Sequence, residues 1–192
     1  MKEELSKDES LALITEMIGQ AKRNLAKGGS FYFLLWGWVV ALANLGHYLI
    51  DRFDWFEHPY IVWLLMIPAM IVTIIYSARR DQRSKIVSHY DRVYSHLWIA
   101  VFIAIVILLT FMQKLDFNQN AVILLFSGLG TYLSGYLLRF KPLIIGGVAL
   151  GVSSIVAFNV SVNDQYLVAA IGLVLGYLIP GYLLKRAESE QV

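Results

Sequence analysis

Cysteine is absent from this sequence of 192 residues, and charged residues are scarce. Without cysteine the chain forms no disulfide, carries no thiolate chemistry and offers no cysteine-ligated metal. Charged residues make up 16%, against about 25% in an average soluble domain, while hydrophobic residues make up 58%. A soluble fold of this length could not bury so much apolar surface, so we expect lipid to cover part of it. The formal net charge of +2 is too small to predict a nucleic-acid partner.

The few charged residues leave six long intervals that contain no Asp, Glu, Lys or Arg. These intervals are 28–50, 58–78, 93–113, 117–138, 142–163 and 165–184. A helix rises about 1.5 Å per residue and the hydrocarbon core of a bilayer is about 30 Å thick, so about 20 residues suffice to cross it. The pattern predicts an all-α, polytopic membrane protein with six transmembrane helices within residues 31–184. We place them at about 31–50, 60–78, 93–113, 120–138, 142–160 and 166–184.

Basic residues are distributed unevenly between the two sides of this arrangement. Of the 16 Lys and Arg residues, only Arg52 and Lys114 fall on the side opposite the termini. The positive-inside rule therefore predicts that both termini lie in the cytoplasm, with residues 185–192 as a short cytoplasmic tail.

The six intervals also lack the groups that membrane-embedded chemistry normally uses. Ion-coupled transporters usually place an ionisable group inside the membrane, and intramembrane hydrolysis would need an acid pair, a metal motif or an activated nucleophile. The sequence contains no G-x-x-x-x-G-K-[ST] phosphate loop either. We therefore expect neither a catalytic activity nor a cofactor.

Residues 1–30 precede the first span and carry a pattern of their own. Ser6 and Glu9 have the spacing of a capping box, which predicts the start of a helix. Apolar side chains three and four residues apart then form one stripe, made of Leu11, Ile14, Ile18, Ala21 and Leu25. We expect this amphipathic cytoplasmic helix to lie on the inner leaflet, to dock on the chain's own loop, or to bind a cytosolic protein. Gly28 and Gly29 would form a flexible joint to the first span.

Small residues four apart occur in the last three expected spans. They are Ser127, Thr131 and Gly135 in the fourth, Gly147 and Gly151 in the fifth, and Gly172 and Gly176 in the sixth. This spacing lets helix backbones approach closely in a membrane, where no hydrophobic effect drives association. Two interpretations stay open: packing of these three spans against one another, or a homodimer through one of the faces.

Two polar residues, Asn44 and His47, lie one turn apart in the outer half of the first span. Polar side chains inside a membrane are costly, so either a structural hydrogen bond or a functional site would explain them. Asn159, at the outer end of the fifth span, is a candidate partner for them.

A possible metal site starts at the same histidine. His47, Asp51, Asp54 and His58 are spaced 4, 3 and 4 residues apart. On a continuous helix this spacing would align two imidazoles and two carboxylates, which suit zinc or another divalent ion. Pro59 and the aromatic residues around Asp54 instead favour a solvated turn.

The segment LITEMIGQAK at 13–22, followed by WGW at 36–38, resembles the start of a group of small uncharacterised bacterial membrane proteins. The resemblance covers the first quarter of the chain. It implies a multi-spanning protein of the bacterial inner membrane and brings no activity or site residues with it.

These observations favour a non-catalytic interaction or regulatory module whose N-terminal helix meets lipid or a cytosolic protein. A small uncoupled transporter or channel, expected to be oligomeric, is the alternative. An intramembrane enzyme comes third.

Overall fold

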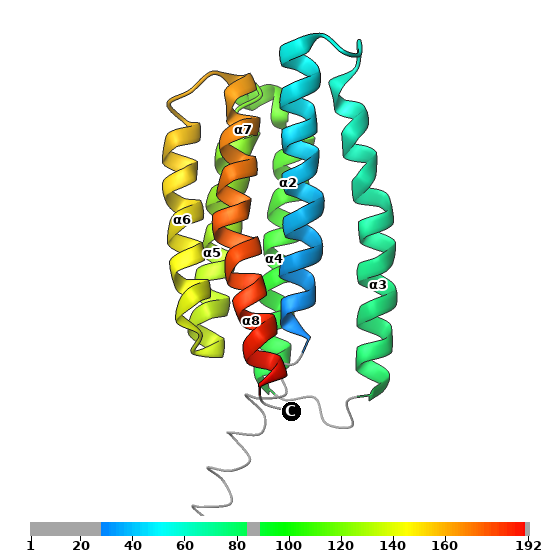
Figure 1. Cartoon of the computed structure of the whole chain (residues 1–192), viewed down its shortest axis with the longest axis vertical. Helices are drawn as coiled ribbons and strands as arrows, with labels where there is room; N and C mark the ends of the chain where they lie inside the picture. Colours follow the sequence, from blue (N-terminus) through cyan, green and yellow to red (C-terminus); the bar gives the residue numbers. More distant parts are fainter. Residues whose placement is uncertain (1–27, 84–88, 191–192) are drawn as a thin grey trace, which may run out of the picture.

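The computed structural model describes residues 28–83 and 89–190. Within these ranges the chain is all-helical and contains no strand, so the all-α part of the predicted fold class is confirmed. The helices run nearly parallel as a bundle (Figure 1). The stripe predicted on the N-terminal helix, Leu11, Ile14, Ile18, Ala21 and Leu25, lies outside the described residues.

The first half of the described chain forms three rods. Helix α2 spans Gly29–Phe53. A 3-10 helix, η1 (Pro59–Leu65), leads directly into α3 (Met66–Arg83). Helix α4 (His89–Thr110) is followed by a short 3-10 helix, η2 (Met112–Leu115).

The second half begins with α5 (Gln119–Leu138) and α6 (Lys141–Ala157). The last rod is continuous and consists of α7 (Val162–Leu173), a π-helical segment η3 (Val174–Leu178) and α8 (Ile179–Ser189). The π segment ends just before Pro180. Proline has no N–H to donate to the carbonyl four residues earlier and its ring crowds that carbonyl, so a wider turn accommodates it.

Five of these rods are long and apolar enough to cross a membrane: α2, η1 with α3, α4, α5, and the α7–α8 rod. Helix α6 has 17 residues and rises about 26 Å, so it is the shorter sixth rod. The fifth span predicted at 142–160 ends three residues early, because the chain turns after Ala157. The side chain of Ser161 then caps α7 by accepting a hydrogen bond from the Asp164 N–H at 3.2 Å.

Helix α8 continues through Ser189, so the tail predicted at 185–192 begins in helical conformation. One-turn contacts support this extension: the Ser189 hydroxyl donates to the Lys185 carbonyl at 3.0 Å, and Arg186 pairs with Glu190 at 2.9 Å.

A long-range contact joins α8 to the start of α2. The Ser30 N–H and hydroxyl donate to the two carboxylate oxygens of Glu188 at 2.9 and 2.7 Å. We call this contact the Ser30–Glu188 clasp. The N-cap of α2 is Gly28, which has no side chain, so Glu188 supplies the acceptor and the negative charge that a helix N-terminus favours.

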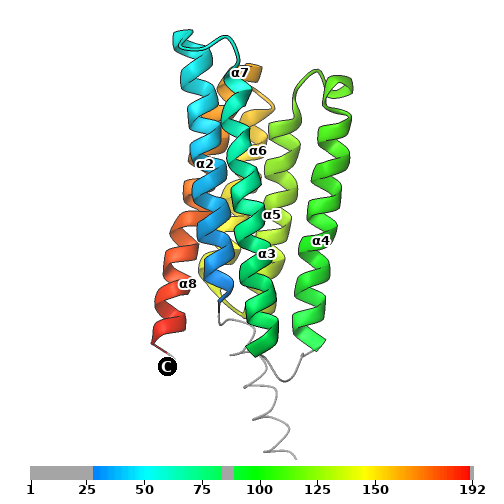
Figure 2. The ribbon, with the colours of Figure 1, turned by 90° about the vertical axis from the view of Figure 1, so that its right-hand side faces the viewer.

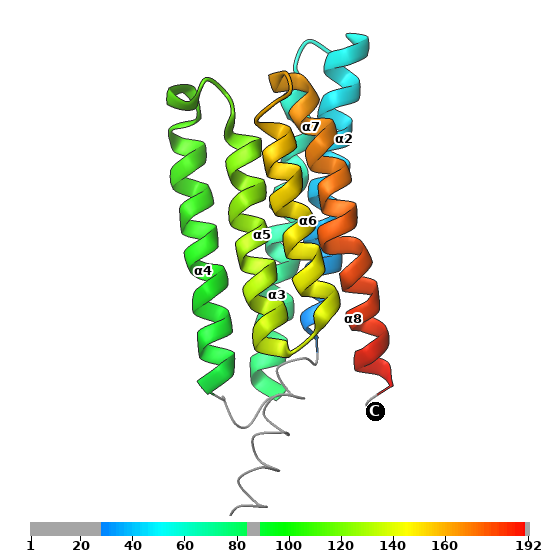
Figure 3. The same cartoon turned by 90° about the vertical axis from the view of Figure 1, so that its left-hand side faces the viewer.

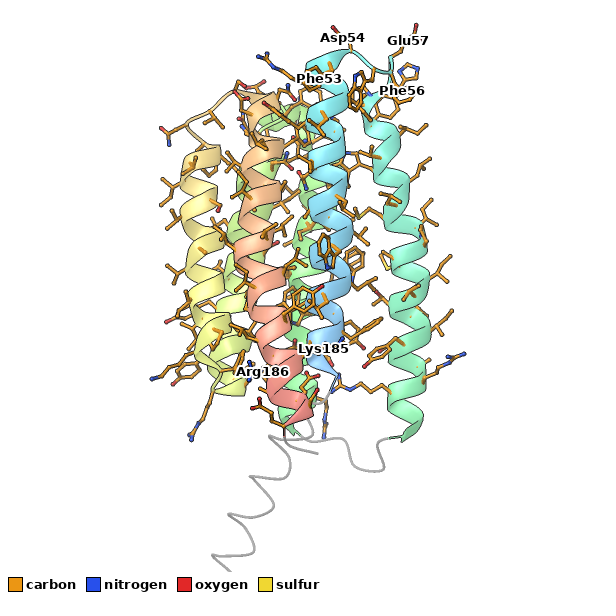
Figure 4. All side chains as sticks on the ribbon, in the orientation of Figure 1. Phe53, Asp54, Phe56, Glu57, Lys185 and Arg186 are labelled. Atoms are coloured by element: carbon orange, nitrogen blue, oxygen red, sulfur yellow. The ribbon has the colours of Figure 1, made fainter. Side chains whose placement is uncertain are left out.

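The two ends of the bundle differ in what they carry. Gly28 and Ser189 lie at one end, here named the Gly28 end, where Lys185 and Arg186 are placed in Figure 4. The turn after α2, with Phe53, Asp54, Phe56 and Glu57, lies at the opposite end, here named the Asp54 end (Figure 4).

Burial divides the bundle into a core and two outer helices. Helices α2, α5, α6 and the α7–α8 rod pack together, with α5 beside α6 (Figure 3). Helix α3 packs against α2 and helix α4 against α5, on the outside of this core (Figure 2). In the most apolar stretch of 18 residues, here called the most apolar window, only 6% of η1–α3 and 6% of α4 is buried. The exposed apolar surface of these helices is compatible with a membrane protein.

Candidate functional site

One face of α5 carries uncharged polar side chains, which point into the core. Gln119 and Asn120 lie at its Asp54 end, and Ser127, Thr131 and Ser134 follow towards the Gly28 end; all five are buried. Spacings of three, four and seven or eight residues place them on a single stripe of the helix. Residues of this stripe belong to two separate clusters, one near each end of the bundle.

The first cluster lies near the Asp54 end and contains four carboxamides, Asn44, Asn118, Gln119 and Gln165. We call it the carboxamide cluster. Gln165, at the start of α7, is fully buried and donates from Nε2 to Asn118 Oδ1 at 2.6 Å. Asn44, on α2, is 1% exposed and donates from Nδ2 to the Val40 carbonyl at 2.8 Å.

Aromatic rings close the side of this cluster. The His47 and Tyr166 rings stack at 3.9 Å, and the Tyr166 hydroxyl interacts with the Gln119 side chain. Trp63 of η1 donates from Nε1 to His47 Nδ1 at 3.1 Å. Four elements, α2, η1, α5 and α7, therefore meet around these side chains.

Three carbonyl oxygens in the cluster lack a hydrogen-bond donor within the described part of the chain. They belong to Asn44, Gln119 and Gln165. A buried acceptor without a donor costs about 1–3 kcal/mol, so such groups normally meet water, an ion or a ligand. The cluster can thus accept hydrogen bonds from a small uncharged polar molecule.

The predicted metal site at His47, Asp51, Asp54 and His58 is not assembled. Helix α2 ends at Phe53, and Asp54 takes a left-handed conformation with φ 50°, so the spacing of 4, 3 and 4 residues loses its alignment. His47 Nδ1 already accepts a hydrogen bond from Trp63, while the His58 ring stacks on Tyr60 at 5.1 Å. Across residues 28–83 and 89–190, no group of three or more His, Asp or Glu side chains is placed to hold a metal ion.

Asn44 and His47 do belong to a polar site, but their expected partner is wrong. Asn159 is exposed and donates from Nδ2 to the Ile155 carbonyl of its own helix at 2.7 Å. The neighbours of His47 are Trp63 of η1 and Tyr166 of α7, whereas Asn44 bonds to the Val40 carbonyl of its own helix.

The second cluster lies nearer the Gly28 end and contains five hydroxyls, those of Tyr94, Ser127, Thr131, Ser134 and Tyr177. We call it the hydroxyl cluster. Thr131 and Ser134 are fully buried, and each donates to the carbonyl four residues earlier, at 2.8 and 2.7 Å. The hydroxyl of Tyr177 interacts with Ser127 and Thr131, and that of Tyr94 with Ser134.

An aromatic group from three rods borders the hydroxyl cluster. Phe33, Trp98 and Tyr177 meet edge to face, with ring centroids 5.5 to 6.3 Å apart. Trp98 also donates from Nε1 to Ser134 Oγ at 3.1 Å, which joins α4 to α5. Because the Thr131 and Ser134 hydroxyls have backbone acceptors, the hydroxyl cluster serves as a packing contact between helices.

Four of the predicted small residues make close helix contacts within the chain. A Cβ on Gly135 would lie 2.6 Å from the Ile144 N of α6, and one on Gly147 would lie 2.5 Å from the Tyr132 N of α5. A Cβ on Gly172 would lie 2.7 Å from Ser153 Oγ, and one on Gly176 would overlap Leu150. Contacts within one chain therefore explain these glycines, as the first of the two interpretations supposed.

Gly151 does not fit that interpretation. A Cβ on Gly151 would meet no atom within 4 Å, because Gly151 lines a small open groove of about 120 Å³ between α5 and α6. Its backbone nitrogen lies near α5, where it would be 3.2 Å from a Cβ on Gly128. The predicted packing role of Gly151 is thus limited to its backbone.

Sequence reasoning did not identify Gln119, Gln165, Tyr166 and Trp63 as members of the site. Gln119 and Gln165 sit at predicted span ends, where a polar residue is ordinary. The stripe on α5 was visible in part, since Ser127 and Thr131 were expected to face another helix.

Comparison of the chain with protein-family models, with curated proteins and with solved structures finds no match. The resemblance of residues 13–22 and 36–38 to small bacterial membrane proteins stays a prediction.

Proposed function

We propose that this chain is a six-span protein of the bacterial inner membrane that acts by binding another protein, without catalysis. The observation that carries the proposal is the exposure of α3 and α4. Helix α4, and α3 together with η1, are long enough to cross a membrane, yet only 6% of the most apolar stretch of each is buried.

The exposed side chains of these two helices form continuous apolar faces. On α3 they include Ile67, Ile71, Ile74 and Ile75, and on α4 Ile99, Phe102, Ile103, Val106 and Ile107. Residues three and four apart share one side of a helix, so each face can receive another apolar helix along its length. A membrane-embedded partner would pack there in competition with lipid.

Photo-crosslinking in native membranes tests this proposal. A photoreactive residue at Ile74 or Ile103 should give a discrete protein adduct. The control is Ile155, equally exposed but on the outside of the core helix α6, which should label lipid alone. Lipid adducts alone at all three positions would contradict binding through α3 and α4.

The N-terminal helix is the second expected docking element, and deletion tests it. Removal of residues 1–27 should reduce recovery of the partner in mild detergent while the bundle keeps its thermal stability. If deletion changes neither partner recovery nor a cellular phenotype, binding through this segment is abandoned.

The proposed topology has its own test in reporter fusions. Fusions ending at Lys85, Lys141 and Val192 should report from the cytoplasm, and those ending at Glu57, Asn118 and Asn163 from the opposite side. Because each span reverses the side of the next, one clear reversal among these six would contradict the six-span topology.

The carboxamide cluster favours a second candidate, an uncoupled carrier of small uncharged polar molecules. Its unpartnered oxygens on Asn44, Gln119 and Gln165 would accept hydrogen bonds from such a solute. Flux of neutral polyols into proteoliposomes should then depend on Gln165 and fall in Gln165→Leu. Equal flux with the wild-type protein and with empty liposomes would remove this candidate.

A further inference from the structure

A groove of about 580 Å³ runs between α2 and α8 at the Gly28 end, and Tyr76 of α3 also lines it. Ligand pockets commonly measure about 300–1,000 Å³. Leu34, Leu35 and Val39 give the groove an apolar wall, and Lys185 lies at its rim. The groove therefore combines a long apolar surface with a cation.

The length of the groove matches one leaflet of a bilayer. Its lining on α2 runs from Gly28 to Val39, which corresponds to about 17 Å along the helix, slightly more than half of a hydrocarbon core of about 30 Å. At the deeper end the Trp38 indole N–H donates to the Tyr182 hydroxyl at 3.0 Å, so this pair bridges α2 and α8. One acyl chain, extended along α2, fits these dimensions.

Close contacts fix the wall of the groove on the side of α3. The rings of Phe31 and Tyr76 stack at 3.8 Å with an angle of 18° between their planes. Gly28 has φ 81°, which a residue with a side chain rarely adopts, and a Cβ there would lie 2.7 Å from the Tyr76 hydroxyl. Glycine at this position thus allows α3 to approach the start of α2.

The charges at the mouth favour an anion. The carboxylate of Glu188 is occupied by the Ser30 N–H and hydroxyl, and it offsets the positive N-terminus of α2. Lys185 is exposed and lies on the side of α8 towards α2 (Figure 4). Lys185 is thus the cation that lines the groove, beside a carboxylate that is already bound.

We propose that this groove binds an anionic phospholipid, with one acyl chain along α2 and the phosphate at Lys185. A basic side chain at the membrane surface attracts anionic lipid, and a lysine can lay its apolar stem against the groove while its ammonium reaches the phosphate. The assignment to the cytoplasmic leaflet rests on the proposed topology; the lipid class rests on the groove itself.

Native mass spectrometry and thermal unfolding of the full chain in mild detergent test the proposal. Added phosphatidylglycerol should bind and raise the Tm, whereas phosphatidylcholine with the same acyl chains should bind more weakly. Lys185→Gln should weaken phosphatidylglycerol binding about fivefold, the loss expected for one basic residue near an anionic surface. Lys141→Gln is the matched control, since Lys141 is exposed at the same end of the bundle but outside the groove.

A second variant tests the apolar part of the site. Val39→Trp fills the groove and should abolish binding of both lipids, while its far-UV circular dichroism and elution volume stay unchanged. Equal affinity of Lys185→Gln and wild type for phosphatidylglycerol, or no preference over phosphatidylcholine, would overturn the proposal. Full competition by glycerol phosphate at equal concentration would overturn it too, because the site would then bind the free anion. Reporter fusions decide the topology separately.

Discussion

Helices α4 and α5 are of similar length, yet their places in the bundle are opposite. The most apolar window of α4 has a mean hydropathy of 2.3 and is 6% buried, whereas that of α5 has a mean hydropathy of 1.7 and is 44% buried. The η1–α3 rod resembles α4, with a mean hydropathy of 2.3 and 6% burial. The two most apolar rods are therefore also the two least buried, the reverse of the order found in water-soluble proteins, whereas the α7–α8 rod, at 2.1, is 56% buried.

Small and polar residues account for this reversal. All nine buried polar residues of the described chain lie on α2, α5, α6 and α7, and Gly135, Gly147 and Gly176 pack these helices closely. Lipid solvates leucine and isoleucine as well as a protein interior does, so apolar side chains gain little by facing inwards. Hydrogen bonds and close backbone contacts select the core instead.

The largest expected effect comes from filling a close contact in the core. Gly147→Leu should lower the free energy of unfolding by about 3 kcal/mol, because its side chain would meet the α5 backbone at Tyr132. Equilibrium unfolding in mixed micelles measures this change. Gly151→Leu, on the same helix, and Ala100→Leu, exposed on α4, are the controls and should each stay within about 0.5 kcal/mol. Equal losses at Gly147 and Gly151 would break the distinction between the close contact at Gly147 and the open groove at Gly151.

The Ser30–Glu188 clasp should give the next largest effect. Glu188→Ala removes both hydrogen bonds at the start of α2 and should cost about 1–2 kcal/mol, the usual range for a lost helix cap. Glu190→Ala is the control, because its ion pair with Arg186 is exposed and such pairs contribute little. If both variants unfold alike in the same micelles, the clasp adds nothing to the core.

A smaller effect is expected where an outer helix is tied to the core. Ser134→Ala removes the acceptor of the Trp98 indole N–H and should cost about 1 kcal/mol. Trp98 fluorescence would report the same change as a shift in its emission maximum. Ser153→Ala is a suitable comparison, since its hydroxyl donates only to a carbonyl of its own helix. An unchanged emission spectrum in Ser134→Ala would show that this hydrogen bond does not hold α4.

The smallest change in stability is expected on the outer faces themselves. Ile74→Ala combined with Ile103→Ala should alter the free energy of unfolding by less than about 0.5 kcal/mol, because lipid or detergent covers these side chains in either state. A loss above 1 kcal/mol in the purified protein would instead place both side chains inside a packed interface of this chain.

The fold was predictable where a single residue type marks a boundary. Charged residues delimit the helical rods, and the fourth span expected at 120–138 coincides with Gln119–Leu138. Ends set by hydrogen bonds between distant residues were not predictable. Helix α8 extends past Lys185 with support from Ser30, which lies 158 residues before Glu188.

The candidate site was predictable only in its local part. Asn44 and His47 stand out because they are polar residues within an apolar span. Their neighbours Gln119, Gln165 and Tyr166 come from α5 and α7, and helix spacing holds no information on which helices meet. The possible metal site is not assembled for a related reason: the spacing from His47 to His58 assumed a continuous helix, whereas α2 ends at Phe53, as expected for the alternative of a turn.

The Ser30–Glu188 clasp also bears on how the chain is made. Synthesis proceeds from the N-terminus, so α2 is made long before α8. Until Glu188 emerges, the N-terminus of α2 lacks its acceptor, and the groove beside it lacks the wall that α8 provides. The start of α2, although it is the earliest of the described helices to be made, therefore completes its packing only when α8 arrives.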